Sequence, residues 1–370
     1  MEIRTKDYFI IILFIAIHNQ INNSKYFEIY KNKTSYYNNF EISKANGHII
    51  SNITSKFQLL IWLILEALLK YNIASNIIKY EIDENNSVGL EIIHDITKKR
   101  AKSDKLILVS PGITDKSFGL FKINIFKFFS KKGFDVCIYW KRGIKDDIKA
   151  DSFYCFGKQD DYIEILKYLS KDYKEIYCIN ISAGCYFPVT IFSNKNFIVP
   201  KEIKGSFYIS LTLEVENTIN DFDKRTDGYF KKKLLKIISR FDKYKSINNS
   251  NIKNSIDLIG EIGKINNNES TRADYFKNLQ FNYNNLKNIT IPSIYFLAKD
   301  DPVTKYKYMK DYIKYFKESD YNMVIITQKG SHTAYISIDL IKGFKFGLWI
   351  FNIILNAINY KKKVVINTLD

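Results

Sequence analysis

Short apolar runs bounded by turn residues recur along the chain from about residue 78. Runs of about four to eight residues with this pattern are typical of strands buried in a sheet. We predict strands at residues 79–82, 88–94, 105–110, 134–140, 175–181, 206–213, 291–298 and 323–327.

Between these runs, apolar residues recur at helical spacing. We predict helices at residues 118–130, 160–169, 185–192 and 305–316, and from 338 onward. Strands that alternate with helices form a mostly parallel sheet flanked by helices, so the fold class is α/β. The alternation stops from about 214 to 284. Helical segments at 229–241 and 274–279 there predict an insertion between two sheet strands.

Three longer apolar runs raise the question of a membrane. Residues 8–17 are too few to span about 30 Å of hydrocarbon, and they fit a signal peptide or a short uncleaved anchor. Residues 57–69 predict an amphipathic or buried helix that could lie on a membrane, and 346–358 a packing helix. We expect a membrane-associated protein of the secretory pathway or endoplasmic reticulum; a cytoplasmic location is the alternative.

Composition adds little to this picture. The net charge is +17, but only six of the 56 basic residues are arginines and the lysines are spread along the chain. A lysine-rich background explains this better than nucleic-acid binding, because arginine is the preferred partner of phosphate and guanine. The cysteines at 137, 155, 178 and 185 form no C-x-x-C pair, so we predict buried residues and no metal site.

The candidate chemistry starts at Ser182. It follows the predicted strand 175–181 and precedes a helix, so it stands at a strand–turn–helix apex, which is the setting of a nucleophile elbow. Ala183 and Gly184 are small enough for the close approach of helix and strands. The backbone N–H of Ala183 is the first candidate donor to an oxyanion.

An activated serine needs a base and a group that orients the base. Of the four histidines, only His332 follows a late strand, where a hydrolase base belongs. Asp300 and Asp301 follow the strand 291–298, between the serine and the histidine. The chain order Ser, Asp, His is that of α/β hydrolases. In the loop after the strand 105–110, the N–H of Ile113 is the candidate second oxyanion donor.

Seven stretches, in one order along the chain, match the motifs of one enzyme family. They are residues 109–114 for H-G-L-T-G, 139–143 for N-x-R-G, 152–155 with 160–161 for T-Y-C-x-x-x-T-E-D-L, 180–184 for G-x-S-L-G, 271–276 for S-x-x-D-Y-Y, 298–302 for the acid loop and 330–335 for G-G-H-x-G-F. In these stretches the chain resembles the YheT-like, or embryogenesis-associated, α/β hydrolases, a group with membrane-linked acylglycerol lipases and esterases.

The resemblance implies an α/β-hydrolase fold with a helical cap at about 214–284. The resemblance runs from about residue 55 to 345. With the composition of the ends, this predicts a domain at 57–360, preceded by a hydrophobic segment and polar, loosely ordered lead-in at 1–56 and followed by a basic tail at 361–370. The resemblance selects Asp301 over Asp300 as the acid. The implied activity is hydrolysis of carboxylic esters of lipids, namely acylglycerols, phospholipids or medium-chain acyl esters, with no cofactor and with a membrane surface as a candidate partner.

Three positions depart from the family motifs. Asn180 and Asp115 stand where glycines are usual, and Pro111 replaces a histidine. These departures leave two alternatives open. One is a weak or inactive hydrolase fold that serves as a membrane-associated binding protein, and the other is acyl transfer to an alcohol at the same site.

Overall fold

The computed structural model describes residues 27–33, 35–42, 49–50, 75–93, 103–115, 119–157, 159–247, 249–333, 335–339, 343–346 and 348–367. The predicted segments at 8–17 and 57–69 lie outside these residues. Within the described part of the chain, no helix has the length and apolar character needed to cross a bilayer.

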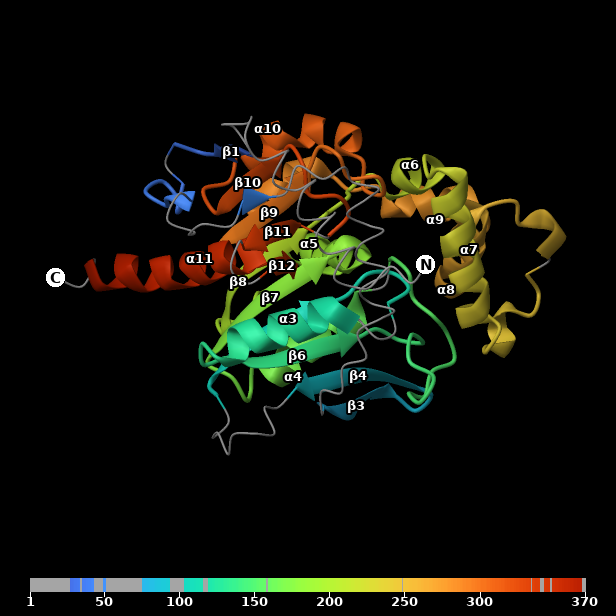
Figure 1. The fold of residues 1–370 in the computed structure, drawn as a ribbon. Helices are drawn as coiled ribbons and strands as arrows, with labels where there is room; N and C mark the ends of the chain where they lie inside the picture. Colours follow the sequence, from blue (N-terminus) through green and yellow to red (C-terminus); the bar gives the residue numbers. More distant parts are fainter. Residues whose placement is uncertain are drawn as a thin grey trace, which may run out of the picture.

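A nine-stranded sheet forms the centre of the molecule (Figure 1). From one edge to the other its strands are β1 (Phe27–Lys31), β10 (Asn322–Thr327), β9 (Ser293–Ala298), β8 (Ile203–Ile209), β7 (Glu175–Ile181), β5 (Lys105–Ser110), β6 (Asp135–Trp140), β4 (Asn86–Ile93) and β3 (Ser75–Asp83). The six strands from β10 to β6 are parallel, and β1, β4 and β3 pair antiparallel at the edges. The predicted mostly parallel α/β sheet is therefore confirmed.

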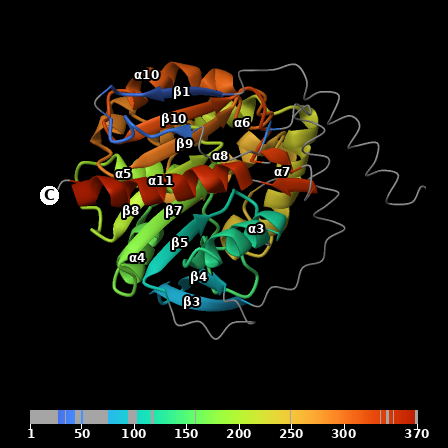
Figure 2. The same ribbon diagram turned by 60° about the vertical axis from the view of Figure 1, so that its left-hand side comes forward.

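The parallel strands are continuous apolar runs because helices cover them on both faces. The flanking helices are α3 (Gly119–Ser130), α4 (Asp160–Leu169), α5 (Tyr186–Phe192), α10 (Ile313–Phe316) and α11 (Leu348–Asn367). Figure 2 shows α11 running across the sheet beside α3. The Phe351 ring of α11 lies 5.8 Å from Phe128 and 5.9 Å from Phe129 of α3. The predicted packing helix at 346–358 thus contributes to the core.

Three predictions are wrong: the helix from residue 338 onward, the helix at 305–316 and the loosely ordered lead-in. Residues from 338 onward do not begin a helix. β11 (Ile336–Asp339) and β12 (Gly343–Phe346) pair antiparallel before α11 starts. The predicted helix 305–316 is broken into the short turns η6 (Tyr306–Tyr308) and η7 (Lys310–Tyr312) followed by α10.

The third error concerns the lead-in, which is not loosely ordered throughout. β1 adds an antiparallel edge strand to β10. Tyr37, Phe40 and Ile42 are buried in the core, and β2 (Ile49–Ile50) pairs with β11. Part of the segment 1–56 therefore belongs to the sheet domain. At the other end, α11 continues to Asn367 and takes in most of the predicted tail.

The insertion between β8 and β9 consists of helices and short turns at the carboxyl ends of the parallel strands (Figure 1). Its elements are α6 (Val215–Asn220), α7 (Lys224–Ile238), η3 (Asp242–Tyr244), η4 (Asn249–Asn251), α8 (Ser255–Asn267), α9 (Arg272–Leu279) and η5 (Tyr283–Asn288). Tyr275 of α9 is 1% exposed and packs where Gly263 of α8 leaves room. Tyr244 joins the insertion to the sheet domain by accepting a 2.9 Å hydrogen bond from the Phe153 backbone N–H.

Candidate active site

Ser182 stands at the sharp turn between β7 and α5. Its φ is 53°, a left-handed conformation that costs a non-glycine residue about 1–3 kcal/mol. The following residues form a 3₁₀ turn, η2 (Ser182–Cys185), that leads into α5. A Cβ on Gly184 would lie 2.2 Å from the Ser110 carbonyl oxygen, so only glycine fits there. The chain thus has the sterically tight strand–turn–helix geometry that characterises a nucleophile elbow.

A continuous hydrogen-bonded chain joins the three predicted residues. His332 Nε2 lies 2.9 Å from Ser182 Oγ, and His332 Nδ1 lies 3.0 Å from Asp301 Oδ2 and 3.1 Å from Oδ1. The three residues follow the carboxyl ends of β7, β9 and β10. The imidazole therefore bridges the hydroxyl and the carboxylate, with one ring nitrogen toward each.

Asp301 is held in place by three further hydrogen bonds. Its Oδ1 accepts from the backbone N–H groups of Val303 at 2.8 Å and Thr304 at 2.9 Å, and its Oδ2 accepts from the Thr304 hydroxyl at 2.7 Å. The side chain is almost fully buried. A carboxylate fixed in this way holds the imidazole in one orientation and favours the tautomer with its proton on Nδ1.

Asp300 has a different task, and the sequence did not reveal it. Its Oδ1 accepts from the N–H groups of Gly330 at 2.9 Å and Ser331 at 3.0 Å, so it anchors the loop that carries His332. Burial raises the pKa of Asp300 despite these bonds. In this loop Ser331 and Thr333 have φ values of 53° and 63°. The Asp300 carboxylate therefore holds the segment before the histidine, and after it the Thr333 N–H donates to Ser210 Oγ at 3.3 Å.

The loop after β5 lies directly over the elbow. Its Gly112 donates its N–H to Asp115 Oδ2 at 3.1 Å, and a Cβ on Gly112 would lie 3.7 Å from the Ser182 Cβ. Ile113 and Ala183, the two predicted oxyanion donors, both line the pocket that contains Ser182. The structure thus brings both residues to the serine, and it adds a carboxylate at Asp115 beside the same loop.

The pocket at Ser182 is apolar and is covered by the insertion. Its cavity volume is about 30 Å³, and the space at the site reaches about 420 Å³ when open solvent is included. The lining side chains are Ile113, Phe156, Ser182, Ala183, Thr212, Val215, Thr218, Ile219, Phe222, Phe230, Ile259, Val303 and Thr304. The hydroxyls of Thr212 and Thr218 bond to each other at 2.7 Å, which leaves the surroundings of Ser182 mostly hydrocarbon.

Two neighbouring basic residues after β6 are buried, but only one of them has a hydrogen-bond partner among the described residues. Arg142 makes a bidentate pair with Asp161, at 2.9 Å and 2.6 Å, and stacks 4.8 Å from the Tyr154 ring. This pair joins the loops after β6 to α4. Lys141 is also buried, but its Nζ has no hydrogen-bond partner among the described residues. Burial lowers the pKa of Lys141 to about 8, an effect that nearby Asp115 partly offsets.

The position of these residues on the sheet decides the fold. A serine at a strand–turn–helix elbow, an acid after a later parallel strand and a histidine after the last parallel strand lie together at one sheet edge. The chain has the α/β-hydrolase fold. Within its described residues, no group of three or more His, Cys, Asp or Glu side chains is arranged to hold a metal ion.

No family model matches the chain, and no curated protein matches it. Similar solved structures include the Pyrococcus furiosus esterase Pf2001, at 15% identity over 77% of this chain and 90% of that chain, with a TM-score of 0.46. Mouse alpha/beta hydrolase domain-containing protein 10 is 11% identical over 80% and 100%, with a TM-score of 0.45. Oligopeptidase B from Leishmania major is 12% identical over 79% and 37%, with a TM-score of 0.48. At these identities and TM-scores the similarities carry no weight for function, and the YheT-like resemblance stays a prediction.

Proposed function

We propose that the protein is a serine hydrolase that cleaves carboxylic esters of lipids. The observation that carries this proposal is the hydrogen-bonded chain from Ser182 through His332 to Asp301, at the end of an apolar pocket. A serine with a base at 2.9 Å, and a carboxylate behind the base, is the arrangement that acyl transfer requires.

In the proposed reaction, Ser182 Oγ attacks the ester carbonyl while His332 Nε2 takes the hydroxyl proton. The tetrahedral intermediate collapses, and the imidazolium returns the proton to the departing alcohol. Water then attacks the acyl-enzyme as His332 takes its proton. The second tetrahedral intermediate collapses with cleavage of the bond between the acyl carbon and Ser182 Oγ, the imidazolium returns the proton to Oγ, and the carboxylic acid is released. Asp301 keeps its charge throughout and stabilises the imidazolium.

The backbone N–H groups of Ile113 and Ala183 are proposed to hold the oxyanion. Donors of this kind are typically worth about 3–4 kcal/mol each in the transition state. Because Gly184 has no side chain, the elbow approaches the loop after β5 closely. This proximity supports an oxyanion hole with one N–H donor from each of these two segments.

The proposed substrate class follows from the pocket. Its wall is built from aliphatic and aromatic side chains of the sheet domain and of α6, α7 and α8 in the insertion. Such a wall favours an acyl chain over a charged or strongly polar group. Acyl transfer to an alcohol uses the same residues, and only the acceptor that reaches the acyl-enzyme distinguishes it from hydrolysis.

One observation favours a second candidate, a weak or inactive hydrolase fold that binds lipid. The carboxylate of Asp115 lies beside the loop proposed to supply an oxyanion donor, and a negative charge there opposes an oxyanion. In this case the pocket binds the ester or acyl chain without turning it over.

A fluorophosphonate probe tests the proposal, because it labels only an activated serine. We expect the wild-type protein and the Ser239→Ala control, at an exposed position on the insertion, to be labelled. Ser182→Ala should lose all labelling. Absence of labelling in folded wild-type protein would refute the hydrolase and favour the binding protein. A series of p-nitrophenyl esters of rising acyl length then measures the preference of the pocket.

A further inference from the structure

The outer face of α7 in the insertion carries a stripe of exposed basic and aromatic residues. Arg225, Tyr229, Lys232 and Lys236 follow one another at spacings of four, three and four, and all four are exposed. Residues at these spacings share one face of a helix. These four residues are called the α7 stripe below.

Within the described part of the chain, no acidic side chain forms an ion pair with Arg225, Lys232 or Lys236. Two acids lie at the start of the helix, and both accept hydrogen bonds from backbone N–H groups. Asp223 caps the first turn by accepting from the N–H groups of Arg225 and Thr226. Asp227 accepts a 2.8 Å bond from the N–H of Ser255 on α8. Arg225, Lys232 and Lys236 therefore present three positive side chains that form no ion pair with a described residue, and Asp223 beside Arg225 leaves the stripe with a net positive charge.

Tyr229, the aromatic residue of the α7 stripe, is exposed to solvent, although large aromatic side chains on the helices of soluble proteins are usually buried. The Tyr229 side chain is 48% exposed, and the Lys233 ammonium lies 4.6 Å from the centre of its ring. A tyrosine flanked by lysines suits the boundary between lipid headgroups and acyl chains, because its ring is apolar and its hydroxyl is polar.

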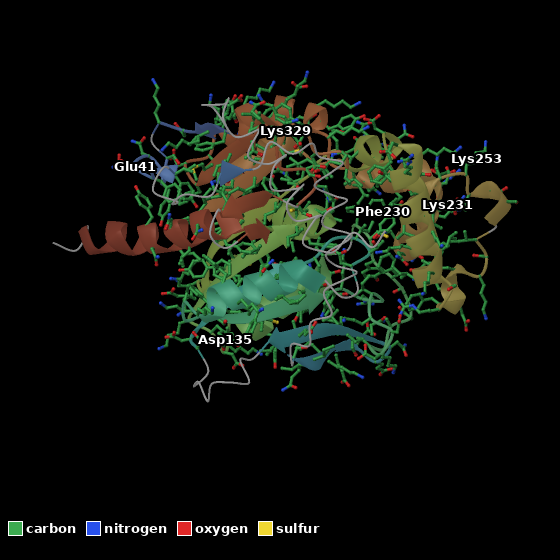
Figure 3. The ribbon with its side chains drawn as sticks, in the orientation of Figure 1. Glu41, Asp135, Phe230, Lys231, Lys253 and Lys329 are labelled. Carbon is green, nitrogen blue, oxygen red and sulfur yellow. The ribbon has the colours of Figure 1, made fainter. Side chains whose placement is uncertain are left out.

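The opposite face of α7 forms part of the pocket at Ser182. Phe230 lines this pocket and stacks on Phe222, with ring centres 5.3 Å apart. Figure 3 shows Phe230 on the side of α7 nearer the sheet, whereas Lys231 lies toward Lys253 on the outer side. One helix thus carries both the wall of the pocket and the α7 stripe.

We propose that the α7 stripe docks the protein on an anionic lipid surface and brings the pocket mouth to that surface. Each lysine or arginine near an anionic bilayer strengthens binding by about a factor of five. A nucleic acid is the less suitable partner, because only one of the three cations is an arginine. The inference rests on the proposed function only for the choice of a lipid as the partner, since docking itself needs no turnover.

Sedimentation with vesicles tests the docking without any catalytic step. We expect the full chain to bind vesicles of phosphatidylcholine and phosphatidylserine, and to bind phosphatidylcholine vesicles much more weakly. Salt should weaken the binding. The double variant Lys232→Glu/Lys236→Glu should bind at least about 25-fold more weakly. Tyr229→Ser should weaken binding without a change of charge. Lys232→Gln/Lys236→Gln replaces the reversed variant if that one fails to fold.

The matched control is Lys195→Glu/Lys201→Glu, which changes the net charge equally. These two exposed lysines flank Ile198, which is 90% exposed, in the loop before β8. This loop joins α5 to β8 and is the competing surface. The proposal is overturned if the wild-type protein does not bind, if binding ignores phosphatidylserine, or if the control loses binding and the α7 variant keeps it. Binding of RNA or DNA, but not of vesicles, would also overturn it. Fluorophosphonate labelling of the same samples reports separately on the proposed function.

Discussion

Replacing Lys141 by methionine should stabilise the protein at neutral pH. Lys141 directly follows β6, and its Nζ is buried and lacks a hydrogen-bond partner among the described residues. It lies 5.8 Å from the Phe187 ring centre. A buried ammonium without a partner is costly because it has lost its water, whereas methionine has a similar shape and no charge.

The magnitude follows from the pKa of Lys141, which burial lowers from 10.5 to about 8. At about 1.4 kcal/mol per pKa unit, this corresponds to about 3 kcal/mol of lost stability. Below pH 8 the ammonium is charged in both the folded and the unfolded chain, so the full penalty applies. Between about pH 8 and 10.5 the folded chain has lost the proton that the unfolded chain still holds, so the wild-type stability rises with pH.

Urea unfolding followed by tryptophan fluorescence measures the effect, because Trp140 and Trp349 are buried in the core. We expect Lys141→Met to raise the free energy of unfolding by about 3 kcal/mol at about pH 7, and by much less at about pH 10. Lys171→Met, at an exposed position, is the control and should change stability by less than about 0.5 kcal/mol. A gain that is absent at pH 7 would show that the Lys141 ammonium is solvated. A gain that is equal at both pH values would show that it comes from packing and not from the charge, and either result would refute the reasoning.

Two further predictions concern the candidate active site. Asp301→Asn should lower kcat for a p-nitrophenyl ester by about 10³–10⁴-fold with little change in KM, because the amide no longer selects the productive tautomer of His332; a kcat close to wild type would remove Asp301 from the mechanism. Asp300→Ala should lower kcat by about 10–100-fold, because the loop carrying His332 loses the acceptor for two N–H groups. Asp300→Asn keeps an acceptor, so its kcat should stay within a few fold of the wild-type value. Equal activity of the two Asp300 variants would contradict the anchoring role.

Strands at the centre of the sheet could be predicted closely from the sequence. The predicted ranges 105–110 and 175–181 coincide with β5 and β7. These strands are buried on both faces, so their apolar runs are unbroken and the residues that end them are polar or small. The same reasoning brought out Ser182, His332 and the pair Asp300 and Asp301, because each follows such a strand or its short loop. The choice of Asp301 within the pair came from the family resemblance.

The edges of the structure were harder to predict. β1 (FEIYK) is only partly buried and pairs with a single strand, so charged residues interrupt its apolar residues and no unbroken apolar run marks it. The segment from 336 to 346 is rich in isoleucine and phenylalanine, and a short apolar run does not distinguish strand from helix. The anchoring role of Asp300 was also hidden, because its partners Gly330 and Ser331 are about thirty residues away and depend on tertiary structure.

Asn180, Pro111 and Asp115 differ from the motifs that the chain resembles, and the structure shows what two of them contact. Asn180 stands where the resembled motif has a glycine, and its side-chain amide donates to Ser206 Oγ of β8 at 2.9 Å. The close contact of the elbow falls instead on Gly184, which the chain retains. Asp115 is the departure that bears on chemistry, because its carboxylate accepts from Gly112 beside the proposed oxyanion hole. If the enzyme is slow, Asp115 rather than Asn180 is the cause to expect, and Asp115→Asn should then be faster than wild type.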